Sequence, residues 1–298
     1  MDIFVSQLFA GLSVGSILLL IALGLTFTFG QMNVINMAHG ELIMAGAYTA
    51  YVMQGGASQA GLQPGPALLV ALPVAFLLAG LIGIVLERLL IRRLYGRPLD
   101  TLLATWGVSL ILQQVARDIF GAPNVQVRSP GWLDGGLQLG GMTLPFARLF
   151  IMALVVAAVA AIWVFLTRLP HGRRMRSVMQ NRQLAAASGV HTARVDRLTF
   201  FIGSGLAGIA GVALTLLGSV GPTLGTSYII DAFLVVIAGG LGQLRGAVLA
   251  AFSLGIINAF VEYGTHASLA KVVLFLAIVA FLQLRPQGLF VLRSRALT

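Results

Sequence analysis

Three polar side chains, Asn36, His39 and Glu41, interrupt the otherwise apolar segment NVINMAHGELIMAGAY near the N-terminus. At bilayer depth such side chains are costly unless they are paired or face water, so they often mark the route of a polar solute. A half-helix that begins near Gly40 would direct unpaired backbone N–H groups toward the membrane interior. The segment therefore predicts part of a solute pathway, although His39 and Glu41 could equally serve only as helix caps at the membrane boundary.

A second short, glycine-broken segment runs from Asp231 through AGGLGQLRG. Paired interrupted segments in the two halves of a chain indicate a transport site near the bilayer midplane. Between them, residues 101–121 carry a polar face, although Gln113 could also lie only at the outer end of that span. The predicted pathway residues are Asn36, His39, Glu41, Thr105, Gln113 and Asp231.

The residues of enzymatic and metal sites are mostly missing. Cysteine is absent, and the four histidines show neither HExxH nor another metal-ligand spacing. The sole lysine, Lys271, follows Ser268-Leu269-Ala270, so there is no GxxxxGK phosphate loop. We predict no catalytic residue, no metal and no cofactor, and any ATP hydrolysis has to come from a partner. A membrane-embedded hydrolase is the enzymatic alternative, but no nucleophile motif supports it.

The composition indicates what kind of fold positions these residues. Of the 298 residues, 58% are hydrophobic and only 9% are charged, whereas soluble domains carry roughly 25% charged residues. Apolar runs long enough to cross a bilayer recur along the whole chain. We predict an all-α, polytopic transmembrane helical bundle that forms one domain over residues 1–298.

The net charge of +10 is distributed as in a membrane protein rather than a nucleic-acid-binding protein. The first 87 residues contain no Lys or Arg, and the arginines then cluster beside apolar spans. Such clusters mark cytoplasmic loops and can touch anionic lipid. We therefore predict a bacterial inner-membrane protein with its N-terminus outside and its C-terminus in the cytoplasm.

Nine spans satisfy this orientation. Residues 34–54 and 229–244 are interrupted by polar residues and glycines, so either could be broken or re-entrant, and eight full spans remain an alternative. Glycine and alanine at four-residue spacing, as in Gly11/Gly15 and Gly203/Ala207/Gly211, predict close helix packing. The predicted spans are 5–29, 34–54, 66–86, 101–121, 145–167, 198–220, 229–244, 247–264 and 269–289.

The longest cytoplasmic segment, residues 168–197, has local signals for helices. Asn181 can cap a short helix, RQLAAAS, that Gly189 can end in the left-handed conformation. Thr192 can cap the helix that follows. The segment therefore presents a compact helix with small side chains to the cytoplasm.

Four stretches resemble the LivH-type branched-chain amino-acid permeases, the membrane subunits of ABC importers. These stretches are INMAHGELIMAGAY, AAASGVHTARVDRLTFFIGSGLAGIAG, GGLGQLRGAVLAAFSLG and LRPQGLF. Three further stretches resemble more narrowly the urea-transporting branch of this family, the UrtB permeases. They are LDTLLATWGVSLILQQVARDIFG, GPTLGTSYIIDAFLVVIAGG and the C-terminal run NAFVEYGTHASLAKVVLFLAIVAFLQLRPQGLF.

The resemblance implies a heterodimer with a sister permease, two cytoplasmic ATP-binding subunits and a periplasmic substrate-binding protein. It also implies that the short cytoplasmic helix docks into an ATP-binding subunit. The residues predicted to make this coupling contact are Arg182, Gln183, Leu184, Ala185, Ala186, Ala187, Ser188 and Gly189.

The scarcity of intramembrane charge favours urea as the substrate, because a zwitterionic amino acid needs compensating charges or helix termini. Branched-chain amino acids and short amides are the alternatives for the same machine. A stand-alone channel or secondary transporter is a more distant alternative, since it needs neither ATP nor the cytoplasmic helix.

Overall fold

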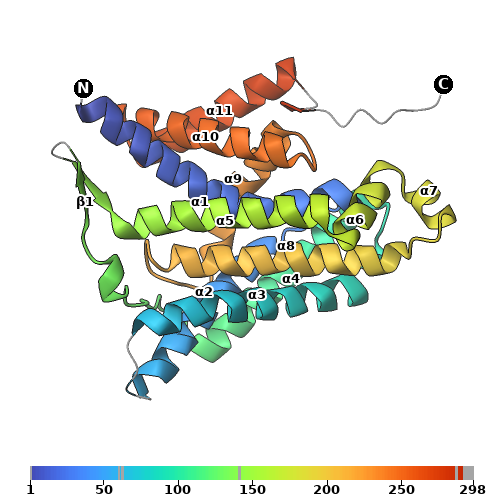
Figure 1. Cartoon of the computed structure of the whole chain (residues 1–298), viewed down its shortest axis with the longest axis horizontal. Helices are drawn as coiled ribbons and strands as arrows, with labels where there is room; N and C mark the ends of the chain where they lie inside the picture. Colours follow the sequence, from blue (N-terminus) through green and yellow to red (C-terminus); the bar gives the residue numbers. More distant parts are fainter. Residues whose placement is uncertain (1, 60, 62–63, 140–141, 286–287, 291–298) are drawn as a thin grey trace.

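The computed structural model describes residues 2–59, 61, 64–139, 142–285 and 288–290, and within them the chain is a bundle of long helices (Figure 1). The prediction of an all-α membrane bundle is confirmed. Five helices are long and apolar enough to cross a membrane, and α9 and α11 are shorter apolar helices. The helices that form the bundle are α1 (Asp2–Met32), α2 (His39–Gln59), α3 (Pro64–Leu89), α4 (Pro98–Phe120), α5 (Phe146–Arg168), α8 (Thr192–Leu214), α9 (Leu224–Gly239), α10 (Leu244–Gly264) and α11 (Ala267–Leu284).

Each predicted span overlaps one of these helices, but the two interrupted segments differ from the prediction. The helix α2 is continuous once it begins at His39, and the interruption is the preceding loop, where Asn33 has φ of 52°. Likewise α9 is continuous, and its break follows it at Gly240 and Gly242, whose φ angles are 96° and 74°. The last predicted span, 269–289, includes residues 286–287, which lie outside the described residues, as does the predicted cytoplasmic tail 291–298.

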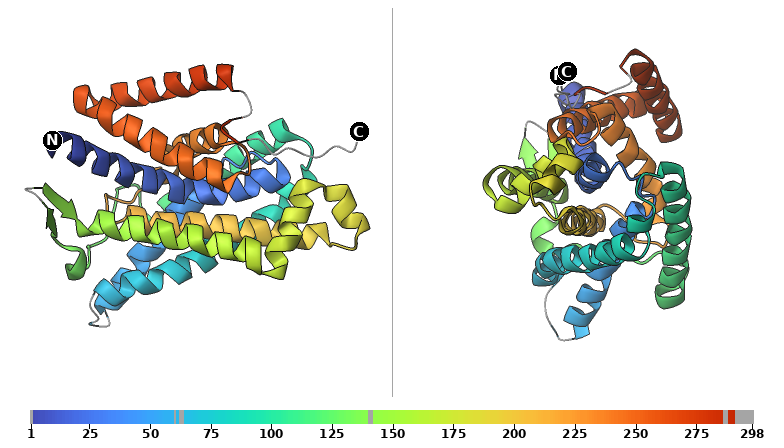
Figure 2. Two further views of the ribbon diagram at one scale, coloured as in Figure 1. Left: turned by 45° about the horizontal axis from the view of Figure 1, so that its top comes forward. Right: turned by 90° about the vertical axis from the view of Figure 1, so that its right-hand side faces the viewer.

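The centre of the bundle is built from α1 and α8. Leu18 to Leu25 on α1 are buried, and α8 packs between α1, α2 and α3 (Figure 2). Glycines allow these close contacts: a Cβ added at Gly203 would lie 2.7 Å from the carbonyl oxygen of Gly24, and one at Gly11 would lie 2.7 Å from Cα of Ile256 on α10. The prediction that these small residues form packing seams is confirmed.

The remaining elements lie at the two ends of the bundle. The N-terminus of α1 and the hairpin of β1 (Gly136–Leu139) and β2 (Met142–Pro145) lie at one end (Figure 1). The helices α6 (Pro170–Gln180) and α7 (Arg182–Ala187) lie at the other end. Two 3-10 turns, η1 (Ile91–Arg93) and η2 (Gly131–Leu133), complete the described elements.

Candidate functional site

The first turns of α2 and α9 meet inside the bundle. A Cβ added at Gly40 would lie 2.7 Å from the carbonyl oxygen of Gly225, and one at Gly225 would collide with the carbonyl of Gly40. No side chain larger than glycine fits either position, so the two backbones cross in direct contact. Two helix N-termini, which carry positive dipole ends, therefore lie together inside the bundle.

Glu41 lies at this crossing and is bound by α4. The hydroxyl of Ser109 and the amide of Gln113 each donate to Glu41 Oε1 at 2.8 Å. The same amide lies 3.1 Å from the hydroxyl of Thr226 on α9, so three helices share one polar cluster. Ser109 and Gln113 lie near the middle of α4, which places the cluster deep in the bundle. Glu41 Oε2 is buried with no hydrogen-bond partner among the described residues, which is uncommon for a buried polar atom.

A cavity of about 380 Å³ opens beside this cluster. Small-molecule sites typically have volumes of about 300–1,000 Å³. Its polar wall combines Glu41, Ser109 and Gln113 with the first turn of α9, and its apolar wall includes Met37, Leu110 and Ile229. The residues that line it are Met37, Glu41, Trp106, Ser109, Leu110, Gln113, Thr223, Thr226, Ser227 and Ile229.

The other predicted pathway residues near α2 support the loop that precedes it. The hydroxyl of Thr105 accepts from the backbone N–H of Met37 at 3.0 Å and lies 3.3 Å from the carbonyl of Ile35. His39 Nε2 is 3.4 Å from the carbonyl of Ile21 on α1. Asn36 is fully buried. None of Thr105, His39 and Asn36 lines the cavity. The contacts of Thr105 and His39 position the start of α2, whereas the side-chain amide of Asn36 has no hydrogen-bond partner among the described residues.

Asp231 lies apart from the cluster. Its carboxylate is 3.8 Å from Nζ of Lys271 on α11, and it does not line the cavity. The structure therefore brings Glu41 and Gln113 together, sets Thr105 against the loop before α2, and places Asp231 in a contact between α9 and α11.

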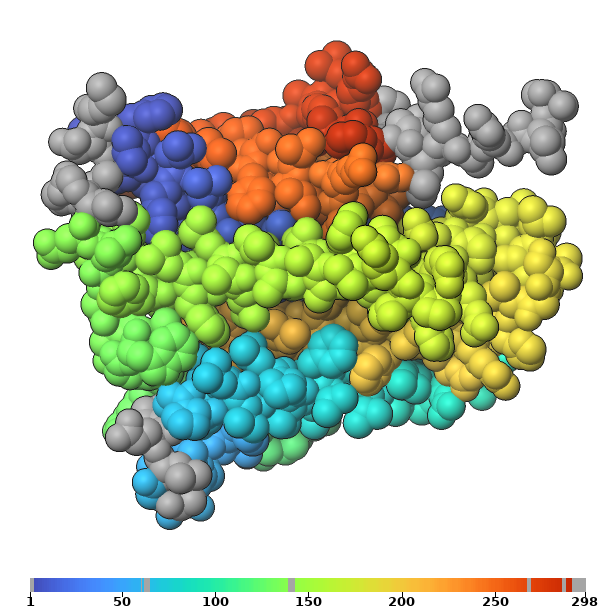
Figure 3. Space-filling model, in the orientation of Figure 1, coloured from blue at the N-terminus to red at the C-terminus, as the bar shows by residue number. Residues whose placement is uncertain are grey.

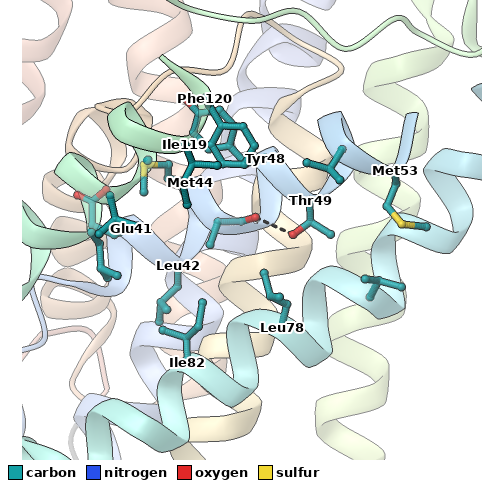
Figure 4. Close-up of a pocket in the computed structure, with 16 residues that line it drawn as sticks. Glu41, Leu42, Met44, Tyr48, Thr49, Met53, Leu78, Ile82, Ile119 and Phe120 are labelled. Carbon is teal, nitrogen blue, oxygen red and sulfur yellow. Dashed lines mark hydrogen bonds between the residues drawn. The ribbon is translucent and has the colours of Figure 1, made fainter. Parts of the chain in front are cut away.

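A second, apolar cavity of about 430 Å³ separates α4 from α2 and α3 (Figure 4). Glu41 lies at one end, while Tyr48 and Phe120 stack at a ring-centroid distance of 4.1 Å. The helix α4 is thus flanked by cavities on two sides. Its polar contacts with Glu41 and with the loop before α2 are joined by apolar contacts of Leu112, Ala116 and Phe120 with α2.

The cytoplasmic helix predicted around Arg182 is present as α7. Asn181 Oδ1 accepts from the backbone N–H of Leu184 at 2.9 Å, and Gly189 has φ of 82°, so the predicted cap and left-handed residue are confirmed. The predicted cap at Thr192 is wrong: Thr192 is the first residue of α8, and His191 occupies the cap position. Leu184 is 65% exposed, and α7 stands at one extremity of the molecule (Figure 3).

Sequence reasoning missed Ser109, Thr226 and Ser227. The one available signal was the four-residue spacing of Ser109 and Gln113, which puts both on one helix face. Within the part of the chain that the structure describes, no group of three or more His, Asp or Glu side chains could hold a metal ion.

Comparison with known proteins shows to which family the chain belongs. The profile of the family described as "Branched-chain amino acid transport system / permease component" matches residues 7–282. The chain belongs to this permease family. It is therefore a membrane component of an ABC transporter and not itself an enzyme, as predicted. Such permeases work together with ATP-binding and substrate-binding proteins.

Individual relatives match along nearly the whole permease. It is 29% identical over 292 residues to the "High-affinity branched-chain amino acid transport system permease protein LivH" of Escherichia coli K12, covering 96% of this chain and 95% of that protein. It is also 29% identical to BraD of Pseudomonas aeruginosa, with the same two shares covered. A probable LivH of Methanocaldococcus jannaschii is 25% identical over 92% of this chain and 88% of that protein.

Proposed function

We propose that this permease carries a small aliphatic amino acid through the cavity between α2, α4 and α9. The observation that carries the proposal is that Glu41, whose Oε2 has no hydrogen-bond partner among the described residues, lines one cavity together with the first turn of α9. A zwitterion needs an anion for its ammonium group and positive charge for its carboxylate. Glu41 supplies the first, and the positive dipole end of α9 supplies the second.

The cavity also has room and apolar surface for an aliphatic side chain. Met37, Leu110 and Ile229 are among the residues that line it. The relatives named above are branched-chain amino-acid permeases, which agrees with this substrate class. The preference for urea drawn from scarce charge did not take account of two helix N-termini meeting at Glu41.

Urea is the second candidate substrate. The residues that line the cavity include neither Lys nor Arg, and a small neutral amide needs only neutral donors and acceptors. The sequence stretches that resemble urea permeases support the same candidate.

Uptake in cells with and without the gene tests the substrate. Labelled leucine and labelled urea are supplied separately at low micromolar concentration, with urease inactivated. We expect deletion to lower ATP-dependent leucine uptake and to leave urea uptake unchanged. Lowered urea uptake with unchanged leucine uptake would transfer the assignment to urea, and no change in either would contradict the proposed function.

We also propose how the permease is oriented in the membrane and which subunits it binds. The end that carries α6 and α7 faces the cytoplasm, since it holds the arginine-rich segment 168–197. The N-terminus of α1 then lies outside. The assembly contains a sister permease, two ATP-binding subunits and a periplasmic substrate-binding protein, and α7 with Ser188 and Gly189 docks into one ATP-binding subunit.

Replacing Leu184 with Asp tests this docking. Leu184 is the large apolar side chain that α7 exposes, and a side chain at the centre of an interface that acts as a hot spot contributes about 2 kcal/mol or more. We expect Leu184→Asp to weaken co-purification of the ATP-binding subunits by roughly 30-fold, while the permease still folds. The control Gln180→Asp adds the same charge at an exposed position of α6, and equal effects of the two variants would contradict the docking site.

A further inference from the structure

An ion pair joins α7 to the rest of the permease. The Arg182 guanidinium donates to both carboxylate oxygens of Asp196 on α8, at 3.1 and 2.5 Å. Among the α7 residues only Ala185 is buried, so apolar packing contributes little to this attachment. The Asp196 side chain has 0% exposure and that of Arg182 has 42%. The bond to Asp196 raises the pKa of Arg182, and the guanidinium therefore keeps its charge.

The same carboxylate also contacts the end of α1. Gln31 Nε2 donates to Asp196 Oδ1 at 3.4 Å, and Gln31 Oε1 accepts from the hydroxyl of Thr199. Gln31, Thr199 and Asp196 are all buried. The Arg182 guanidinium lies 5.3 Å above the ring of Tyr95. The helix α7 is therefore fixed to α8, to the last turn of α1 and to the loop after η1 by one polar network.

A continuous set of contacts leads from this network to Glu41. Gln31 is followed by Met32, the end of α1, and by the left-handed Asn33. Val34 packs with Ile91 and Phe200. The loop then binds Thr105, as described above, and α2 begins at His39, two residues before Glu41. A displacement of Gln31 thus has a short path of packed and hydrogen-bonded groups to the cavity.

We propose that the Arg182–Asp196–Gln31 network transmits the movement of α7 to the loop before α2, which makes these three side chains positioning residues for transport. The inference rests on the proposed function, because it requires an ATP-binding subunit to move α7. The alternative is that the network only stabilises the fold. The two differ in one observable: a transmission element changes how much solute moves per ATP, whereas a fold stabiliser changes how much protein assembles.

The test uses the complete importer reconstituted in proteoliposomes, with uptake and ATP hydrolysis measured in the same vesicles. Asp196→Asn is the preferred variant, because the half-exposed Arg182 can turn to water when its partner loses charge. Arg182→Gln alone would leave a buried carboxylate unpaired and is more damaging to folding. Arg97→Gln is the matched control, since Arg97 pairs with Asp100 at 3.8 Å and both side chains are exposed.

We expect Asp196→Asn to lower uptake per ATP about tenfold, with ATP hydrolysis and assembly close to the wild type and Arg97→Gln unaffected. The double variant Asp196→Asn with Arg182→Gln is expected to show the same uptake per ATP as Asp196→Asn alone, because the two side chains of the ion pair act together. Unchanged uptake per ATP in assembled Asp196→Asn would overturn the inference.

If the Asp196→Asn variant does not assemble, the Gln31→Leu variant tests the inference instead. This variant removes the contact with α1 and leaves the ion pair intact, so we expect reduced uptake per ATP, and an unchanged ratio would overturn the inference. A wild-type importer that hydrolyses ATP without uptake of any tested solute would instead overturn the proposed function, and would be recognised before any variant is made.

Discussion

Replacing Glu41 with glutamine is expected to remove most uptake while leaving the permease folded and assembled. Glutamine has the same size, and its carbonyl oxygen can still accept from Ser109 and Gln113, which now donate to Glu41 Oε1. The change removes the anion that pairs with an ammonium group. Losing one partner of a buried charged contact costs about 2–4 kcal/mol, or roughly 30- to 700-fold. The measurement is ATP-driven leucine uptake in proteoliposomes.

Glu262→Gln provides the matched control for this prediction. Glu262 is exposed on α10 and lies 3.3 Å from Asn258, so the same chemical change occurs away from the cavity and should leave uptake unaltered. Full activity of Glu41→Gln would contradict a role for Glu41 in binding the ammonium group. The Glu41→Gln change would reduce the uptake of a neutral substrate such as urea much less. The size of the loss therefore also distinguishes an amino acid from urea as the substrate.

Replacing Gly225 with valine is expected to prevent folding. The Cβ of the added side chain would overlap the carbonyl group of Gly40 and would lie 2.9 Å from the backbone nitrogen of Glu41. Both neighbours are backbone atoms at the start of α2, which cannot move aside as a flexible side chain would. Overpacking costs about 1–3 kcal/mol and occasionally more, and we expect the upper end here. The measurement is the yield and the thermal unfolding temperature in detergent.

Gly107→Val is the matched control for this crossing. Gly107 is also in a membrane helix, but an added Cβ there meets nothing within 4 Å. We expect this variant to be close to the wild type in yield and unfolding temperature. Equal stability of Gly225→Val and Gly107→Val would show that α2 and α9 do not cross in direct contact.

The helices could be predicted because hydropathy alone decides which segments lie in a bilayer. The cap at Asn181 and the turn at Gly189 were also predictable, since both depend on local backbone geometry. Thr192 was misassigned for a local reason as well. The N–H groups of Arg194 and Val195 both lie within hydrogen-bond distance of the carbonyl of His191, so α8 begins one residue earlier than the hydroxyl suggested.

The composition of the site could be predicted only in part, because one sequence does not encode which helix faces which. Glu41 and Gln113 were identified as polar residues in apolar surroundings. Their direct contact, and the contribution of Thr226, depend on how α2, α4 and α9 pack. Asp231 has the same sequence character, yet α11 places Lys271 beside it. The Gly40–Gly225 crossing likewise joins two residues far apart in the chain.

The most direct test of the central claim, that the solute passes between α2, α4 and α9, is thiol labelling at Ser227. The chain contains no cysteine, so a single introduced thiol is the only one in this subunit, and its labelling is read on the band of this subunit. Ser227 lines the cavity without belonging to the Glu41 cluster. The variant Ser227→Cys, in the complete importer, is treated with a membrane-impermeant thiol reagent. Leu103→Cys, on the exposed apolar face of α4, is the control.

We predict that the thiol of the Ser227→Cys variant reacts, that its rate of reaction changes with ATP, and that leucine with the binding protein slows it. The thiol of the Leu103→Cys variant is expected not to react. Failure of the Ser227→Cys variant to react in every state, or a reaction unaffected by substrate and ATP, would contradict the pathway.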